Sequence, residues 1–171
     1  GRGGAYRYLS DYLEPPADGG FHLVPHDISL QTEKVQAVPQ VDDVQLQAIG
    51  VHHGPIAAVA WRVNIGGCSL VFSGDMSDRH DSLTRLARDA DLLVAHNAVP
   101  QSATGTALNL HMRPSTIGEI ASEAAVGSLL LSHRMRRTLG DEENTLREIR
   151  NHYRGEIQFA EPLQELLLQG H

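Results

Sequence analysis

The stretch Val71-Phe72-Ser73-Gly74-Asp75 joins a short apolar run to a tight turn that ends in a carboxylate. An apolar run of this length, bounded by turn residues, indicates a buried strand. Because Gly74 has no Cβ, the backbone can turn sharply there and direct the Asp75 side chain into a cleft. We therefore expect Asp75 to lie just beyond the carboxyl end of a buried strand.

The residues before this run predict further strands. Apolar and polar residues alternate over residues 21–28 and 44–52, and Asp42-Asp43 supplies a turn ahead of the second segment. Residues 58–65 form another candidate strand, and Gly66-Gly67 is a two-residue hairpin turn that leads from it into the apolar run. We expect the two strands joined by this hairpin to be antiparallel.

Beyond the Ser-Gly-Asp turn the pattern changes to that of a helix. Apolar residues recur at helical spacing from Leu83 to Ala90, and Ser77 or Asp78 is placed to cap the first turn. Residues 91–95 then indicate a fully buried strand, and the polar stretch over residues 97–109 indicates a loop.

The last third of the chain predicts two more helices and three more strands. A helix begins at a Thr116-x-x-Glu119 capping box and ends at Gly127, and a buried strand over residues 128–132 then delivers His133. A second helix covers residues 142–153 and is capped by Asp141. Two strands follow, over residues 156–160 and 163–168.

Strands that alternate with helices predict an α/β fold, in which the loops after the carboxyl ends of strands carry the chemistry. His53, Asp75, His96 and His133 all follow or end a predicted strand. Imidazole suits zinc, iron or manganese, and a carboxylate can bridge two cations at a separation of roughly 3.5–4 Å. The pattern therefore predicts a metal site.

Length and composition favour one globular domain over residues 1–171, with residues 1–43 as a poorly assigned lead-in. No run approaches the roughly 20 apolar residues of a membrane helix. The net charge of -7 argues against a broad electrostatic grip on nucleic acid, although a local basic patch could still meet phosphate. The single cysteine, Cys68, permits no internal disulfide and makes the cytoplasm the expected location.

Four segments, taken in their order, resemble the later motifs of the metallo-β-lactamase superfamily. They are Val51-His52-His53-Gly54, Ala60-Trp61-Arg62-Val63, Val71-Phe72-Ser73-Gly74-Asp75 and Leu129-Leu130-Leu131-Ser132-His133. The similarity spans most of residues 44–169 and is greatest to the ribonuclease Z, phosphodiesterase and arylsulfatase-like branch. It implies the C-terminal half of an αββα sandwich, with a mixed sheet and helices on one face.

The resemblance also implies an activity and a set of site residues. A metal-dependent hydrolase of this kind uses a metal-bound hydroxide on an ester, phosphodiester or sulfate ester, with two divalent ions, zinc first and manganese or iron as alternatives. By resemblance, His53 ligates one metal, with His52 as its competitor, Asp75 bridges both metals and His133 ligates the second. His111 matches a histidine thought to help protonate the leaving group.

The sequence departs from the family pattern in several places. Met76 replaces the usual threonine, Asn97 replaces a glutamate, and no counterpart of the arm that grips transfer RNA is visible, which weakens an assignment to ribonuclease Z itself. The family's His-x-His-x-Asp-His motif does not occur in the sequence. We therefore expect a truncated chain that needs its N-terminal half or a partner chain to complete a dinuclear site, and that could form a homodimer.

Each candidate has a structural alternative. A non-catalytic scaffold or binding module that retains the fold is the competing function, and an unrelated doubly wound α/β domain is a third. The residue alternatives are a turn aspartate for Asp75, a satisfied strand-end histidine for His133, a loop-packing role for His111, a hydrogen bond to a ligand for His96, and a solvated stretch rather than an anion clamp for Arg134, Arg136 and Arg137.

Overall fold

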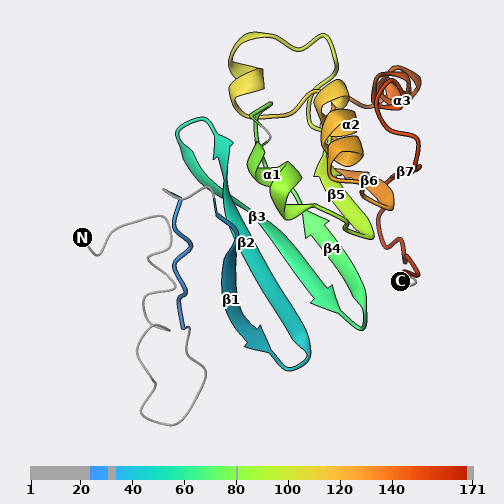
Figure 1. Cartoon of the computed structure of the whole chain (residues 1–171). Helices are drawn as coiled ribbons and strands as arrows, with labels where there is room; N and C mark the ends of the chain where they lie inside the picture. Colours follow the sequence, from blue (N-terminus) through green and yellow to red (C-terminus); the bar gives the residue numbers. More distant parts are fainter. Residues whose placement is uncertain (1–23, 31–33, 80, 169–171) are drawn as a thin grey trace.

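The computed structural model describes residues 24–30, 34–79 and 81–168. One mixed sheet, whose strands follow one another in chain order, forms the centre of the molecule (Figure 1). Its strands are β1 Gln36–Val41, β2 Val44–His53, β3 Ile56–Ile65, β4 Cys68–Phe72, β5 Leu92–His96, β6 Ser128–Ser132 and β7 Glu156–Phe159. The helices are α1 Asp81–Leu86, the 3-10 helix η2 Gly105–Asn109, α2 Pro114–Glu123 and α3 Glu142–Arg150.

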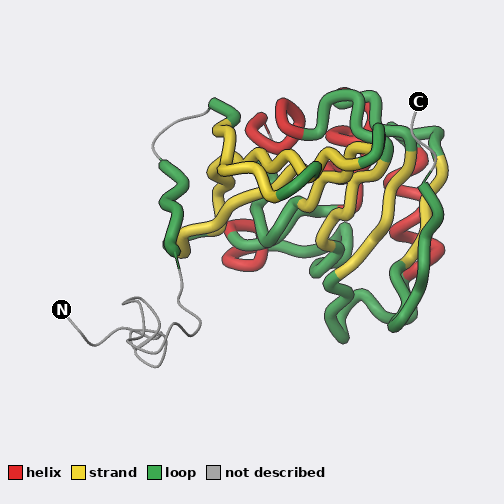
Figure 2. The backbone as a smooth tube through the Cα atoms, turned by 90° about the horizontal axis from the view of Figure 1, so that it is seen from below, coloured by secondary structure: helices red, strands yellow, loops and turns green. Residues whose placement is uncertain are grey.

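The direction of the strands brings several carboxyl ends to one edge. The pairs β1·β2, β2·β3 and β3·β4 are antiparallel, whereas β4·β5, β5·β6 and β6·β7 are parallel. Strand β2 therefore runs in the same direction as β4, β5 and β6, and these four carboxyl ends lie together. Seen from below, the strands form one continuous layer (Figure 2).

One apolar core joins the sheet to all three α-helices. In Figure 1, α1 and α2 lie over the sheet, and α3 lies beside α2. Leu83 of α1, Ile120 of α2 and Ile149 of α3 belong to the same buried cluster as Leu93 of β5 and Leu129 of β6. This confirms the α/β fold with helices on one face. No helix within the described ranges is long and apolar enough to cross a membrane.

The central strands agree with the sequence prediction. The expected hairpin at Gly66-Gly67 is present, since Ile65 pairs with Cys68 across a two-residue turn. The turn predicted at Asp42-Asp43 is also present, and it joins the unpredicted β1 to β2, since Val41 pairs with Val44. Gly66 and Gly67 both have positive φ, which is the conformation that such a turn requires. The predicted strands over residues 91–95, 128–132 and 156–160 appear as β5, β6 and β7 with small shifts at their ends.

Two predicted strands are wrong at the chain ends. Residues 24–28 have no regular structure, and residues 21–23 lie outside the described part. Pro25 has no N–H to donate to a ladder, which disfavours a strand there. Residues 163–168 are also irregular. At the start of this segment, Leu163 has a φ of 62°, which a strand does not allow, and its side chain is fully exposed. Instead, the lead-in contributes β1, which alternation alone did not indicate.

Helix α2 begins and ends earlier than predicted. Arg113 is the N-cap and Pro114 is the first helical residue, where a fixed φ and a missing N–H cost nothing. Thr116 therefore lies inside the helix and cannot form a capping box. The helix ends at Glu123, and Gly127 is needed for a different reason, since a Cβ there would lie 2.9 Å from the Asp91 carbonyl oxygen.

The caps predicted for α1 are also wrong. Helix α1 begins at Asp81, after both candidates, and their side chains have other partners. The Ser77 hydroxyl is hydrogen-bonded to His52 at 2.8 Å, and the Asp78 carboxylate accepts from the Arg113 backbone N–H and side chain. At the other end, Arg62 donates to the carbonyl oxygens of Leu86 and Arg88, which satisfies the end of α1.

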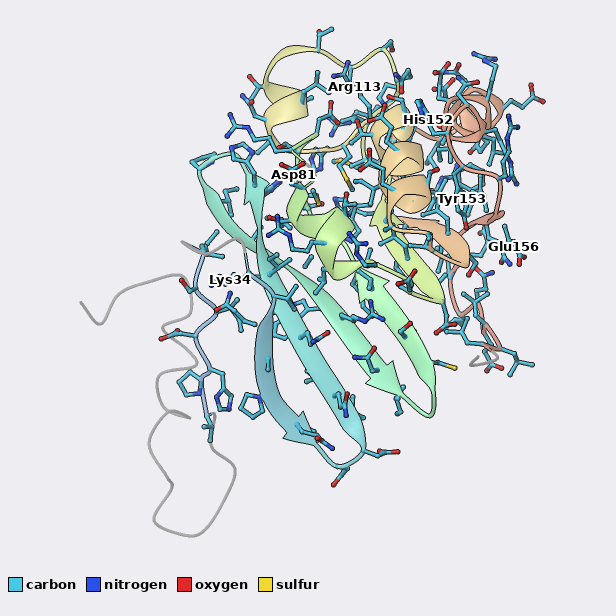
Figure 3. The ribbon with its side chains drawn as sticks, viewed as in Figure 1. Lys34, Asp81, Arg113, His152, Tyr153 and Glu156 are labelled. Atoms are coloured by element: carbon cyan, nitrogen blue, oxygen red, sulfur yellow. The ribbon has the colours of Figure 1, made fainter. Side chains whose placement is uncertain are left out.

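Helix α3 begins where predicted, after Asp141, but ends at Arg150. Tyr153, labelled in Figure 3, lies beyond the helix and is buried. Its hydroxyl donates toward the carbonyl oxygens of Val126 and Gly127. This contact ties the segment after α3 to the connection between α2 and β6.

Candidate metal centre

Four histidines surround the Asp75 carboxylate at the edge where the parallel strands end. Asp75 follows β4, while His53, His96 and His133 end or follow β2, β5 and β6. His111 comes from the loop between η2 and α2. The topology thus brings together residues that are up to 80 positions apart, counting from 53 to 133.

Three imidazoles face one carboxylate oxygen. His96 Nδ1 donates a hydrogen bond to Asp75 Oδ1 at 2.8 Å. The distances from the same oxygen to His133 Nε2 and His111 Nδ1 are 3.3 and 3.6 Å. Ligand atoms of Asp75, His111 and His133 all lie within 4.8 Å of one another, which is compatible with one shared cation. His96 therefore contacts the carboxylate, as expected for a residue that orients a ligand.

His53 faces the second carboxylate oxygen. Its Nε2 lies 4.0 Å from Asp75 Oδ2, which is too far for a hydrogen bond. Its Nδ1 lies 2.7 Å from the Leu110 carbonyl oxygen, an acceptor only. Nδ1 must therefore carry the proton, and in the neutral ring Nε2 keeps a lone pair that faces the centre. His52 lies outside this cluster and contacts Ser77.

Backbone conformation at two positions aims these side chains. Gly74 has a φ of +60°, and a Cβ there would lie 2.8 Å from the Val59 carbonyl oxygen. Only glycine fits this turn without strain, as the sequence indicated. His133 has a φ of 50°, which is uncommon for a residue with a side chain. Such strained backbone is found preferentially at functional sites.

The centre is closed on one side and open on the other. The side chains of His53 and His111 are about nine-tenths buried, at 11% and 10% exposed. The His133 side chain is 40% exposed and Asp75 is 32% exposed. Within the described chain, the centre is therefore most accessible on the side of His133.

The electrostatics keep Asp75 ionised. Burial by itself would raise the pKa of this carboxyl, but the hydrogen bond from His96 and the proximity of His133, His96 and His111 lower it below 3.8. For His111, burial is the largest influence and lowers the pKa below 6.5, and the Arg137 charge lowers it further against the opposing effect of Asp75. These influences favour an ionised Asp75 and a neutral His111 at neutral pH.

These residues fit a divalent cation. His111 Nδ1 is buried and makes no hydrogen bond within the described part of the chain, although it faces Asp75. A buried polar nitrogen without a hydrogen bond is costly unless an ion or water meets it. The donor set of imidazole and carboxylate is the one that zinc, iron and manganese prefer.

Comparison with known proteins identifies the fold. No protein-family model matches the sequence. Over 106 residues the chain is 32% identical to the Bacillus subtilis (strain 168) protein named "Probable metallo-hydrolase YhfI", covering 62% of this chain and 42% of that protein. The crystal structure of the metallo-β-lactamase fold protein YhfI matches with a TM-score of 0.65 at 28% identity, over 74% of this chain and 50% of that one. This chain is a metallo-β-lactamase fold protein.

Two more distant structures share the metallo-β-lactamase fold. Human tRNase Z, short form, matches with a TM-score of 0.58 at 18% identity, over 77% of this chain and 46% of that one. A diphosphatase from the PhnP family matches with a TM-score of 0.52 at 16% identity, over 79% of this chain and 45% of that one. The chain spans about half the length of the relatives that it matches.

Proposed function

We propose that this chain supplies part of the active centre of a metal-dependent hydrolase. The observation that carries the proposal is the convergence of four imidazoles on the Asp75 carboxylate. When bound there, divalent ions would lower the pKa of a water molecule to roughly 7 and so supply hydroxide at neutral pH. Zinc is our first choice of ion, and two ions are the proposed number.

Each residue has a proposed task. Asp75 would bridge the ions, since His133 faces its Oδ1 and His53 faces its Oδ2. These two histidines would hold one ion each. His96 would fix the carboxylate through its 2.8 Å hydrogen bond.

His111 has two candidate roles. As a proton donor it would protonate the leaving group, as the family resemblance implies. As a ligand it would share a cation with Asp75 and His133, and its buried Nδ1 without a hydrogen bond supports this second role. Metal analysis of His111→Ala separates the two, because loss of a proton donor preserves metal content and slows substrates with poor leaving groups most.

We propose a phosphodiester as the substrate to test first, with carboxylic and sulfate esters as alternatives. The names of two structural relatives, tRNase Z and a diphosphatase, concern bonds to phosphorus. The centre has an open side next to His133, which could admit a phosphate group.

We further propose that the remaining metal ligands come from another segment or another chain. The sheet face opposite the helices supports this, because it presents a row of neighbouring apolar side chains, Trp61, Phe72, Val94 and Leu130. Phe72 is exposed and the other three are half-buried. Apolar surface of this kind favours contact with a partner. A homodimer and a cytoplasmic location stay predictions.

The competing candidate is a non-catalytic scaffold that retains the fold, and it predicts that the full-length protein also lacks His-x-His-x-Asp-His. The test is metal content and phosphodiesterase activity of the full-length protein with Asp75→Ala. We expect both to fall, whereas Asp43→Ala, in the exposed turn at the far end of β2, should change neither. Unchanged metal content and activity in Asp75→Ala would support the scaffold.

A further inference from the structure

Ser77 and Asp78 lie in the turn that carries Asp75, two and three residues after the carboxylate. They do not cap helix α1, which begins only at Asp81. Ser77 is buried and Asp78 is half-buried. Their hydrogen bonds lead instead to two other segments of the metal centre, and each of these segments carries a histidine.

Ser77 holds the turn to the end of strand β2. Its backbone N–H donates to the His52 carbonyl oxygen at 2.7 Å, and its hydroxyl is hydrogen-bonded to His52 Nδ1 at 2.8 Å. His52 directly precedes His53 in the same strand. Because neighbouring residues share one continuous backbone, these two hydrogen bonds fix the position of His53 relative to Asp75.

Asp78 holds the same turn to the loop that carries His111. Its carboxylate accepts from the Arg113 backbone N–H and from Arg113 Nε, both at 2.8 Å. Arg113, labelled in Figure 3, lies two residues after His111. The contact between the two side chains is charge-assisted, and such a hydrogen bond is about twice as strong as a neutral one.

The two histidine-bearing segments also meet each other. His53 Nδ1 donates to the Leu110 carbonyl oxygen at 2.7 Å, and Leu110 directly precedes His111. The turn after β4, the end of β2 and the loop before α2 therefore form a closed ring of hydrogen bonds around the centre.

This ring acts where direct contacts with the carboxylate are missing. His53 and His111 are the two most buried histidines of the centre, and neither is hydrogen-bonded to Asp75. His53 Nε2 lies 4.0 Å from Asp75 Oδ2, and His111 Nδ1 lies 3.6 Å from Asp75 Oδ1. The width of these two gaps depends on how the three segments are held together. A metal site needs its ligands held within about 0.5 Å of their productive positions by surrounding contacts.

We propose that Ser77 and Asp78 form a brace that sets the ligand geometry of the centre before a cation binds. Ser77 positions His53, and Asp78 positions His111, each relative to Asp75. Both act through a histidine rather than on the cation, so they are positioning residues. This inference rests on the proposed metal-dependent function and adds to it the residues that hold the ligands in place.

The test uses Ser77→Ala and Asp78→Asn in the full-length protein, with Ser69→Ala and Asp91→Asn as matched controls. Asp91 Oδ2 accepts from the Ser69 backbone N–H at 2.6 Å and from its hydroxyl at 2.9 Å, at the amino ends of β4 and β5. The controls therefore remove contacts of the same kind away from the centre. Zinc affinity, measured by competition with a chelator, should fall about 10-fold or more in each brace variant and should not change in the controls.

NMR signals of the histidine rings in the metal-free protein provide a readout that a loss of stability alone would not move. Ser77→Ala should shift mainly the His53 ring signals and Asp78→Asn mainly those of His111, whereas the controls should shift neither.

Ring signals of His53 and His111 that shift no more in the brace variants than in the controls would overturn the inference. Unchanged zinc affinity in both brace variants would also overturn it when the wild type binds zinc. A wild-type protein that binds no zinc, together with the selective ring shifts, would instead count against the proposed function alone.

Discussion

Gly74→Ala tests whether the turn before Asp75 determines both stability and metal binding. Gly74 has a φ of +60°, and a side chain in this region costs about 1–2 kcal/mol. The new Cβ would also lie 2.8 Å from the Val59 carbonyl oxygen, closer than the 3.0 Å below which a neighbour must shift. Overpacking of this kind costs about 1–3 kcal/mol. The loss of unfolded-state entropy on replacing glycine offsets about 0.4–1 kcal/mol.

The free energy of unfolding should therefore fall by roughly 1–4 kcal/mol in Gly74→Ala. Gly66→Ala is the matched control, because Gly66 has a similar φ of +57° but no atom within 4 Å of the new Cβ. Its free energy of unfolding should fall only by the difference between the backbone strain and the entropy offset, at most about 1.6 kcal/mol.

Urea unfolding followed by circular dichroism measures both variants, and zinc titration then measures the effect on the centre. Gly74→Ala should weaken zinc binding because the turn that aims Asp75 must move, whereas Gly66→Ala should not. If the two variants lose equal stability, the contact with Val59 does not constrain the turn and the reasoning is refuted.

Three further predictions concern the centre and the core. His96→Ala should weaken zinc affinity by about 10- to 100-fold in a chelator competition, because Asp75 loses the hydrogen bond that orients it. His152→Ala, which removes only a contact with Glu119, is the control and should leave zinc affinity unchanged. Leu93→Ala should lower the free energy of unfolding by about 2–5 kcal/mol, because Leu93 is fully buried. Leu163→Ala, at a fully exposed position, should lower it by about 0.5 kcal/mol or less, and equal losses would contradict the assigned core. Tyr153→Phe should cost about 1–2 kcal/mol at pH 8, because two buried carbonyl oxygens lose their donor. Burial raises the pKa of Tyr153 above 10.0. The stability that its neutral hydroxyl contributes is therefore present below pH 10.0 and is lost as the pH rises through the raised pKa. In urea melts at alkaline pH, the difference in free energy of unfolding between wild type and Tyr153→Phe should become smaller.

Local patterns predicted the middle of the chain better than its ends. The Gly66-Gly67 turn and the buried runs of β4, β5 and β6 depend on neighbours in sequence, and they appear as expected. The strand predicted at residues 163–168 fails because alternation of apolar residues cannot supply a partner strand. The start of α2 was misplaced because the sequence carries two start signals within three residues, a capping box at Thr116 and a proline at position 114. The helix begins at Pro114, so the proline marks its true start.

The sequence by itself determined which side-chain types follow the strands, the glycine turn that aims Asp75, and the succession of strands and helices from β2 to β7. These features depend on single residues and on short-range periodicity, which local chemistry controls. The tertiary structure alone decided which histidines converge within the described part of the chain, and that the Leu110 carbonyl oxygen fixes the proton on His53 from 57 residues away. It also distinguished the arginines after β6, because Arg134 pairs with Glu142 and Arg137 donates to the Ala98 carbonyl oxygen, and these contacts depend on how the loop after β6 packs.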